Sequence, residues 1–219
     1  MNFKAFFLKE EEPIQSVADK APVEVLRVTI PGIRELRDGL AEDTIRTKFD
    51  WLMKASFEDA VIGIKNGKIV WYQGTWIDGH FKESVWETGI FKNGKFSGVA
   101  KNIEWQDGTF VKGDIWSGTW KKGTFLEGSF KGTWLSGVWK GNEFTGTFKN
   151  GLFESGSFID GQFMNGTFRN GRFINGEFNG GVFESGYWMN GKFNAKKAIW
   201  KSGIDRDGDI LKHPPVFQD

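Results

Sequence analysis

Few residues of this 219-residue sequence could carry chemistry, and their types exclude several classes of site. Cysteine is absent, which excludes a disulfide scaffold, a thiolate metal site and a cysteine nucleophile. His80 and His213 are the only histidines, and their distance in the sequence argues against a histidine metal cluster. The many glycines include no Gly-Lys-Ser/Thr ending of a phosphate-binding loop. We therefore expect a protein that is not an enzyme and that holds no cofactor or metal.

Two groups of acidic residues were candidates for a site. Residues 205–209 read Asp-Arg-Asp-Gly-Asp, like the start of a calcium loop, but the twelfth position, which needs a bidentate glutamate, is Val216. We interpret this segment as a charged turn that ends the repeat region. Glu127 and Asp107 could form a carboxylate pair, but a polysaccharide-cleaving site would need clustered acids beside exposed aromatic side chains.

Aromatic residues recur every five residues from Trp71 to Phe193. Three of the steps are one residue short, and with these the region holds 26 repeat positions, of which aromatic residues fill 24. The exceptions are Ala100 and Ile115, and Gly stands two positions before the repeat position in 22 units. A regularity of this kind predicts a repeat architecture in which each unit packs on its neighbours.

The five-residue unit predicts a β-solenoid with three-residue strands as its sides. Pairs such as Asn-Gly, Asp-Gly and Ser-Gly suit tight corners, because Gly tolerates a positive φ. Side chains alternate along a strand, so the aromatic residue points inward while its two neighbours point outward. Trp116 and Tyr187 are out of this phase, which makes them either a ligand platform or ordinary surface residues.

Lysines just outside the core positions recur at every second unit, and this spacing predicts the number of sides. A three-sided coil would scatter them over all faces, whereas a four-sided coil sorts them into two columns and places five acidic residues on a third face. We therefore expect a four-sided coil, with a meander of hairpins as the alternative. The columns would be Lys82, Lys101, Lys121 and Lys140 on one face, Lys92, Lys112, Lys131, Lys149 and Arg169 on the opposite face, and Glu87, Asp107, Glu127, Glu143 and Glu184 on the third.

The rest of the chain predicts a small cap and a tail. Residues 1–60 are expected to form an α/β cap of ββα type, with strands at 2–8 and 23–30 and a helical stretch that begins near Ile33. Asp43 or Thr44 could cap the second half of that helix. Residues 61–200 would form the solenoid and residues 201–219 a C-terminal tail.

The repeat region resembles the pentapeptide-repeat proteins, a family of right-handed quadrilateral β-helices. The match rests on a small residue followed two positions later by a central Leu or Phe, as in Gly161-Gln162-Phe163-Met164-Asn165. The sequence departs from the family in using Gly rather than Ala and in placing Asn or Asp after the aromatic residue, which leaves the corner type open. The resemblance implies a mainly β, right-handed, four-sided helix.

The first ten residues give a second resemblance. Residues 1–10 resemble the capsid-targeting tags on internal head proteins of large tailed phages, which implies processing after Glu10. An ordinary amphipathic first strand is the alternative. The apolar cluster at residues 5–8 is too short for a secretory signal, and no run of 18 apolar residues could span a membrane. We therefore expect a phage virion or the host cytoplasm as the location.

These features favour a non-enzymatic structural or protein-binding solenoid of phage origin. Its partner would be a virion component, a host protein or a further copy of the chain. One alternative is an inhibitor of a host enzyme or defence protein, although the topoisomerase inhibitors of the family present acidic rods and this chain has a net charge of +1. The other is a polyanion-binding module that uses the lysine columns, because residues 61–200 carry 17 Lys and Arg against 12 Asp and Glu. We do not expect nucleic acid as the partner, because the aromatic side chains that would stack on bases are in the core phase.

Overall fold

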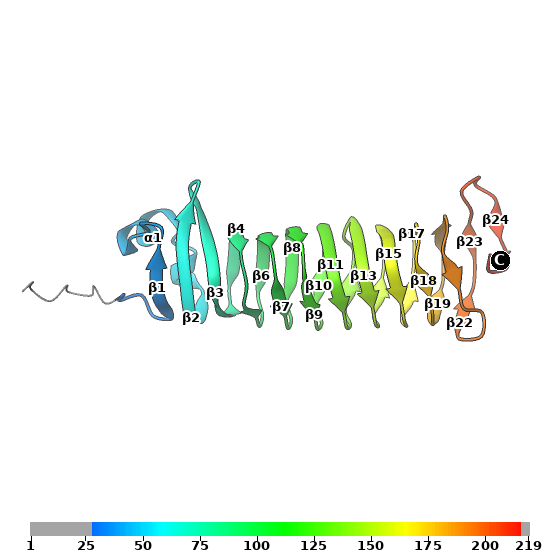
Figure 1. Ribbon diagram of the computed structural model, residues 1–219, viewed down its shortest axis with the longest axis horizontal. Helices are drawn as coiled ribbons and strands as arrows, with labels where there is room; N and C mark the ends of the chain where they lie inside the picture. The colour runs from blue at the N-terminus through cyan, green and yellow to red at the C-terminus, as the bar shows by residue number, and fades with distance from the viewer. Residues whose placement is uncertain (1–27, 216–219) are drawn as a thin grey trace, which may run out of the picture.

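The computed structural model describes residues 28–215, which form a rod built almost entirely of short β-strands (Figure 1). The chain winds as a β-solenoid of about 9 turns with coils of about 15 residues. A cap with one short α-helix lies at the N-terminal end, and a small hairpin lies at the C-terminal end.

Parallel pairing between coils gives the coil length directly. Phe125 pairs with Phe110, 15 residues earlier, and with Trp139, 14 residues later. Following these partners along the rod sorts the buried positions into three columns, which we call A, B and C. Column A is Trp76, Phe91, Trp105, Trp120, Trp134, Phe148, Phe163, Phe178 and Phe193; column B is Phe81, Phe96, Phe110, Phe125, Trp139, Phe153, Phe168, Phe183 and Trp200; column C is Trp71, Trp86, Ala100, Ile115, Phe130, Phe144, Phe158, Phe173 and Trp188.

The predicted four-sided coil is therefore wrong, and so is the hairpin meander. Four sides of five residues would pair residues about 20 apart, whereas the partners are 14 or 15 apart. A meander would give antiparallel neighbours, but the strands of successive coils are parallel. The strands of the solenoid are β4 (His80–Trp86), β5 (Ile90–Phe91), β6 (Lys95–Ala100), β7 (Ile103–Trp105), β8 (Thr109–Ile115), β9 (Gly118–Trp120), β10 (Thr124–Phe125), β11 (Gly128–Trp134), β12 (Val138–Trp139), β13 (Glu143–Phe148), β14 (Leu152–Phe153), β15 (Ser157–Phe163), β16 (Thr167–Phe168), β17 (Gly171–Phe173), β18 (Glu177–Phe178), β19 (Gly181–Phe183), β20 (Gly186–Trp188), β21 (Lys192–Phe193) and β22 (Ala198–Trp200).

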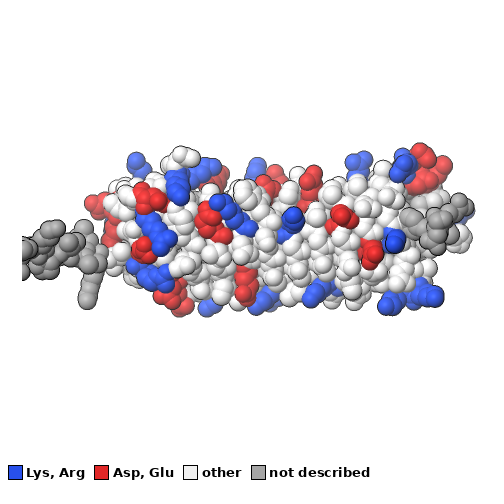
Figure 2. All heavy atoms as spheres, in the orientation of Figure 1, with Lys and Arg blue, Asp and Glu red and all other residues white. Residues whose placement is uncertain are grey.

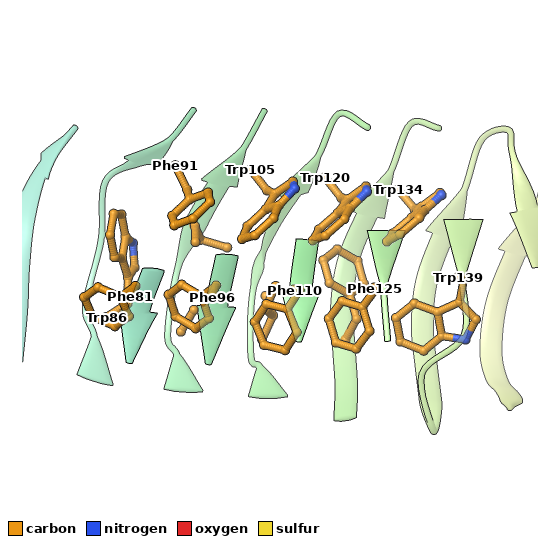
Figure 3. Close-up of a cluster of buried hydrophobic side chains, with 14 of the residues drawn as sticks. Phe81, Trp86, Phe91, Phe96, Trp105, Phe110, Trp120, Phe125, Trp134 and Trp139 are labelled. Atoms are coloured by element: carbon orange, nitrogen blue, oxygen red, sulfur yellow. The ribbon is translucent and has the colours of Figure 1, made fainter. Parts of the chain in front are cut away.

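Three side chains per coil fill the interior, and all but Ala100 and Ile115 are aromatic. Within a column the rings stack, as with Trp105 and Trp120, whose centroids are 4.4 Å apart with planes 4° apart (Figure 3). Between columns they meet edge to face, as with Trp134 and Trp139 at 5.8 Å and 90°. All 26 repeat positions are buried except Phe193, which is partly buried, so the inward phase predicted for the aromatic residues is confirmed.

Glycine allows the coils to approach at the corners. Gly123 has φ +114°, and a Cβ atom there would clash with the carbonyl oxygen of Gly108, one coil below. Gly137 repeats this relation one coil above, with φ +117° and the carbonyl oxygen of Gly123 as the obstacle. The corner therefore needs glycine both for its positive φ and for the missing side chain.

The N-terminal cap differs from the prediction in its first half. The expected strand at 2–8 lies outside the described residues, and residues 28–30 form no strand. The segment from Ile33, expected to be helical, is a strand that pairs in parallel with the strand after the helix. The helix has Ala41 at its N-cap, with no side-chain capping bond from Asp43 or Thr44. The elements are β1 (Ile33–Arg37), α1 (Glu42–Lys48), the 3-10 helix η1 (Leu52–Lys54), β2 (Ser56–Lys65) and β3 (Lys68–Asp78).

Strands β2 and β3 join the cap to the rod. They form an antiparallel hairpin, and β3 contributes the first members of columns A and C. The predicted boundary between residues 60 and 61 falls inside β2, so one strand belongs to both units.

A hairpin closes the other end. Strand β23 (Gly203–Ile204) pairs in parallel with β20, and β24 (Ile210–Leu211) pairs antiparallel with β23. The carboxylate of Asp205 accepts the backbone N–H groups of Asp207 and Asp209 at 3.0 and 2.9 Å. The segment 205–209 is thus the charged turn that the sequence indicated, with its first carboxylate bonded to its own backbone.

The core phase predicts a large difference between adjacent substitutions. Phe163 is 0% exposed and Met164 is 42% exposed. We expect Phe163→Ala to reduce the free energy of unfolding by about 3 to 5 kcal/mol, because it leaves a cavity in column A. Met164→Ala should change it by less than about 0.5 kcal/mol. Urea unfolding measures both values, and a Phe163→Ala variant as stable as the parent would contradict the inward phase.

The corner geometry predicts a second difference, between two glycines that both have positive φ. Gly39 has φ +73° with no atom within 4 Å of an added Cβ, so Gly39→Ala should cost only the backbone term of about 1 kcal/mol. Gly123→Ala adds a clash between backbones of neighbouring coils, and we expect it to cost at least about 3 kcal/mol. Thermal and urea unfolding of the two variants would measure this, and equal costs would show that the coils can move apart.

Candidate interaction surfaces

The three-sided coil scatters the predicted lysine columns. Lys82 and Lys140 lie directly after column B residues, Lys101 after a column C residue and Lys121 after a column A residue. The second predicted column is divided in the same way. Lys92 and Lys149 follow column A, Lys131 follows column C, and Arg169 and Lys112 follow column B. The two opposite basic faces expected from a four-sided coil are therefore absent from the described part of the rod.

Many of these cations are paired with acids of a neighbouring coil. Because the acids come from the same surface, the rod shows separate charged groups of both signs among uncharged atoms (Figure 2). The predicted acidic face is divided as well, since Glu87 follows a column C residue and Glu184 follows a column B residue. The pairs are Lys101–Glu87 at 2.8 Å, Lys112–Glu127 at 3.5 Å, Lys121–Glu104 at 2.7 Å, Lys140–Glu154 at 3.2 Å and Arg169–Glu184 at 2.7 Å.

Side B, the outward surface over column B, carries an uncharged row. These residues stand directly before the column B residues and pair with one another from coil to coil, so they form a straight line. The line is about 29 Å long at strand spacing. It ends at Ile199, whose side chain is 60% exposed. The uncharged row consists of Thr109, Thr124, Val138, Leu152, Thr167, Val182 and Ile199.

An ion ladder runs beside the uncharged row. It consists of Lys140, Glu154, Arg169, Glu184 and Lys201, the residues directly after the column B residues, and their charges alternate in sign. The Glu184 carboxylate accepts Arg169 at 2.7 Å and Lys201 at 3.4 Å. These bonds, first the one from Arg169, hold the pKa of the Glu184 carboxyl below its ordinary value against a smaller opposite effect of desolvation. The ladder thus neutralises most of its own charge.

The sequence analysis missed the uncharged row because its members are 14 to 17 residues apart. They align only when every third five-residue unit is superposed, whereas the predicted four-sided coil superposes every fourth unit. The signal was present in the sequence, but reading it required the coil length.

The exposed aromatic residues do not form one site. Trp116 is 56% exposed and Tyr187 is 43% exposed, and both lie over column C. Five coil steps separate them, which is about 24 Å at strand spacing. The guanidinium group of Arg172 lies 5.8 Å from the Tyr187 ring centroid, so this ring has a neighbour within the chain.

The other candidates are likewise separate. Asp107 pairs with Lys122 at 2.9 Å and Glu127 pairs with Lys112, so the two carboxylates do not form a catalytic pair. Residues 28–215 contain no group of three or more His, Asp or Glu side chains placed to hold a metal ion. None of the helices described is long and apolar enough to cross a membrane. The candidate processing site at Glu10 lies outside the described residues.

Comparisons of the chain with protein-family models, with curated proteins and with solved structures gave no match.

The ion ladder predicts a pH-dependent contribution to stability. Because the pKa of Glu184 is lowered in the folded protein, its contribution is present above the unfolded pKa and is lost as the pH falls through the folded pKa. We expect Glu184→Gln to lower the urea midpoint slightly at pH 7 and to match the parent at pH 3. The difference at pH 7 should also shrink in about 1 M salt.

Glu143→Gln is the matched control, since Glu143 forms no ion pair within residues 28–215. A Glu184→Gln effect that is independent of both pH and salt would show that the ladder contributes packing rather than charge.

Proposed function

We propose that this protein is a non-enzymatic rod that binds another protein along side B. The observation that carries the proposal is the uncharged row, Thr109 to Ile199, on a flat parallel sheet surface. Val, Ile, Leu and Thr side chains there remain partly accessible, and their contact with a partner would remove apolar surface from water.

The ion ladder supports the same surface. Charged groups in an interface must lose water, and unpaired ones make this loss costly. Here Arg169 and Glu184 already form an ion pair, so a partner that covers the row leaves neither charge without an opposite charge. A straight row of this length matches one dimension of an interface of ordinary size, which buries about 800 Å² on each partner.

The number of units in a coil and the handedness of the solenoid are also part of what we propose. We infer that each coil consists of three five-residue units and winds right-handed, because right-handed connections between parallel strands predominate at about 98%. The resemblance of residues 1–10 to phage capsid-targeting tags supports a virion component or a host protein as the partner. The column lysines are scattered over three sides, and Lys101, Lys112, Lys121 and Lys140 are paired with acids, which weakens the support for a polyanion along the rod.

The row predicts the effect of two outward substitutions. Leu152→Lys with Val182→Lys places two cations in the uncharged row without touching the core. We expect the free energy of unfolding to change by less than about 1 kcal/mol and partner binding to be lost. Tagged parent and variant proteins would be incubated with extract of the native host, and retained proteins would be quantified by mass spectrometry.

The control variant carries Thr133→Lys and Gln162→Lys, which place the same charges at the corresponding positions over column A. A partner must be retained by the parent and by this control and lost by the side B variant. Equal retention by all three proteins would contradict binding through the uncharged row.

A further inference from the structure

The junction of the cap and the first two coils contains a pocket whose lining includes three lysines and two serine hydroxyl groups. The pocket has a volume of about 440 Å³. Lys48 at the end of α1, Lys68 at the start of β3 and Lys82 in β4 contribute to its wall, together with His80, Ser84 and Ser97. Phe49 and Trp51 of the cap supply an apolar part of the lining. Three separate elements therefore bring positive charge to one place.

The lysines of this pocket are not neutralised by ion pairs in the part of the chain that the structure describes. None of Lys48, Lys68 and Lys82 forms an ion pair there, in contrast to the paired lysines farther along the rod. Lys95 lies beside His80, because the two residues are neighbours across the parallel strands β4 and β6. It adds a fourth ammonium group that forms no ion pair within the described residues. Of the residues that line the pocket, Glu83 is the one acid.

Nearby acids outside the pocket are occupied. Asp50 follows α1, and Lys82 is near enough to contribute slightly to lowering the pKa of its carboxyl group. The Asp50 carboxylate, however, already forms an ion pair with Lys54 at 2.5 Å. Four lysines against one acid leave an excess of positive charge, and like charges held together repel one another. An anion in the pocket would relieve this repulsion.

The polar groups of the pocket suit an anion with several oxygen atoms. His80 Nε2 lies 3.3 Å from the hydroxyl of Ser97, so the ring and the hydroxyl are held side by side. The Ser84 hydroxyl donates to the Lys82 carbonyl at 2.7 Å and helps to fix that part of β4. Lysine ammonium groups, a histidine N–H and a serine hydroxyl are the donors that bind phosphate oxygens.

We propose that this pocket binds the phosphate group of a small molecule, either free phosphate or a phosphorylated compound. Lys48, Lys68 and Lys82 would contact the phosphate oxygens from three sides, with His80 and Ser97 as further donors. Lys95 would add attraction at the edge of the pocket. The site shares no residue with the uncharged row, since it rests on residues of the cap and of the first two coils.

The pKa of His80 reports on the binding of an anion in the pocket. Burial lowers its pKa first, and the charges of Lys82 and Lys95 lower it further. The other charged groups around it are Lys48, Lys68, Glu83 and, more distant, Asp50. A bound dianion offsets the repulsion by the lysines, so it must raise the pKa of His80. By linkage, the dianionic form of the ligand binds more tightly as the pH falls through that pKa.

The test uses the full chain with phosphate, pyrophosphate and phenyl phosphate in chloride buffers of matched ionic strength. Isothermal titration calorimetry should show one site per chain, and NMR should show a raised pKa for His80 with no change at His213, the other histidine. Phosphate and pyrophosphate binding without phenyl phosphate binding would indicate a free anion as the ligand, and binding of all three would indicate a phosphorylated compound.

Substitutions of lysines and of the acid in the pocket should change the affinity for pyrophosphate in opposite directions. Lys68→Gln and Lys82→Gln should each weaken pyrophosphate binding by about tenfold, because each removes a charged hydrogen bond. Glu83→Gln should strengthen it a few-fold, since it removes the opposing acid. Lys131→Gln is the control, because Lys131 is also outside any ion pair of the described residues but follows column C in a distant coil.

Several outcomes would overturn the proposal. These are no binding of pyrophosphate at millimolar concentration, an unchanged pKa of His80, or equal weakening by Lys131→Gln. A DNA duplex that binds through the same lysines more tightly than pyrophosphate would also overturn it, because the site would then be part of a polyanion surface. Urea unfolding of each variant confirms that lost binding does not reflect lost folding.

Discussion

At the corners of the rod, a glycine α-carbon lies against the carbonyl oxygen of the glycine one coil below. Gly108, Gly123 and Gly137 illustrate this contact, and a Cβ atom at any of the three would clash with the neighbouring backbone. The contact fixes how closely coils approach and where the chain turns. Because successive coils turn at the same place, their strands stay parallel and in register, and most aromatic residues come to lie on an aromatic residue of the coil below, with Phe130 on Ile115 as an exception. The columns depend on the corners.

The aromatic columns show what this register gains and costs. In most coils three rings close the cross-section through edge-to-face contacts, and stacking along the axis places Phe148 and Phe163 4.8 Å apart at 7°. The cost lies in the indole N–H groups. Those of Trp105, Trp120 and Trp134 are buried without a hydrogen-bond partner, at about 1 to 3 kcal/mol each. Stacking and burial of large rings offset that cost. Phenylalanine fills most repeat positions after Trp139, where Trp188 is the one repeat position that buries such an N–H group.

The sequence predicted the core but not the coil. The five-residue spacing shows which side chains point inward, since packing constrains those positions directly, and all except Phe193 are buried. The same spacing is compatible with any number of sides. The lysines gave a wrong number of sides because the free energy of an exposed cation depends little on which side it occupies. The recurrence of lysine at every second unit, as at Lys82 and Lys92, therefore carried no information on the number of sides. In the cap, Ile33 and Leu36 have helical spacing, but pairing of β1 with β2 overrides it. The pocket at His80 could not be predicted, because it joins residues of the cap to two coils.

Side B connects the two surfaces that the structure distinguishes. His80 and Lys95 occupy the positions of side B that become the uncharged row from Thr109 onward, since Lys95 pairs with Thr109. Lys95 and His80 therefore continue the line of the uncharged row at its N-terminal end. A rod of stacked similar sides offers a partner several equivalent registers, because each coil repeats the last. A charged end distinguishes one of them. A partner that places an acidic or phosphorylated group at His80 and an apolar strip along Val138 to Ile199 would bind in one register only, because a shift by one coil would leave the cations without an anion.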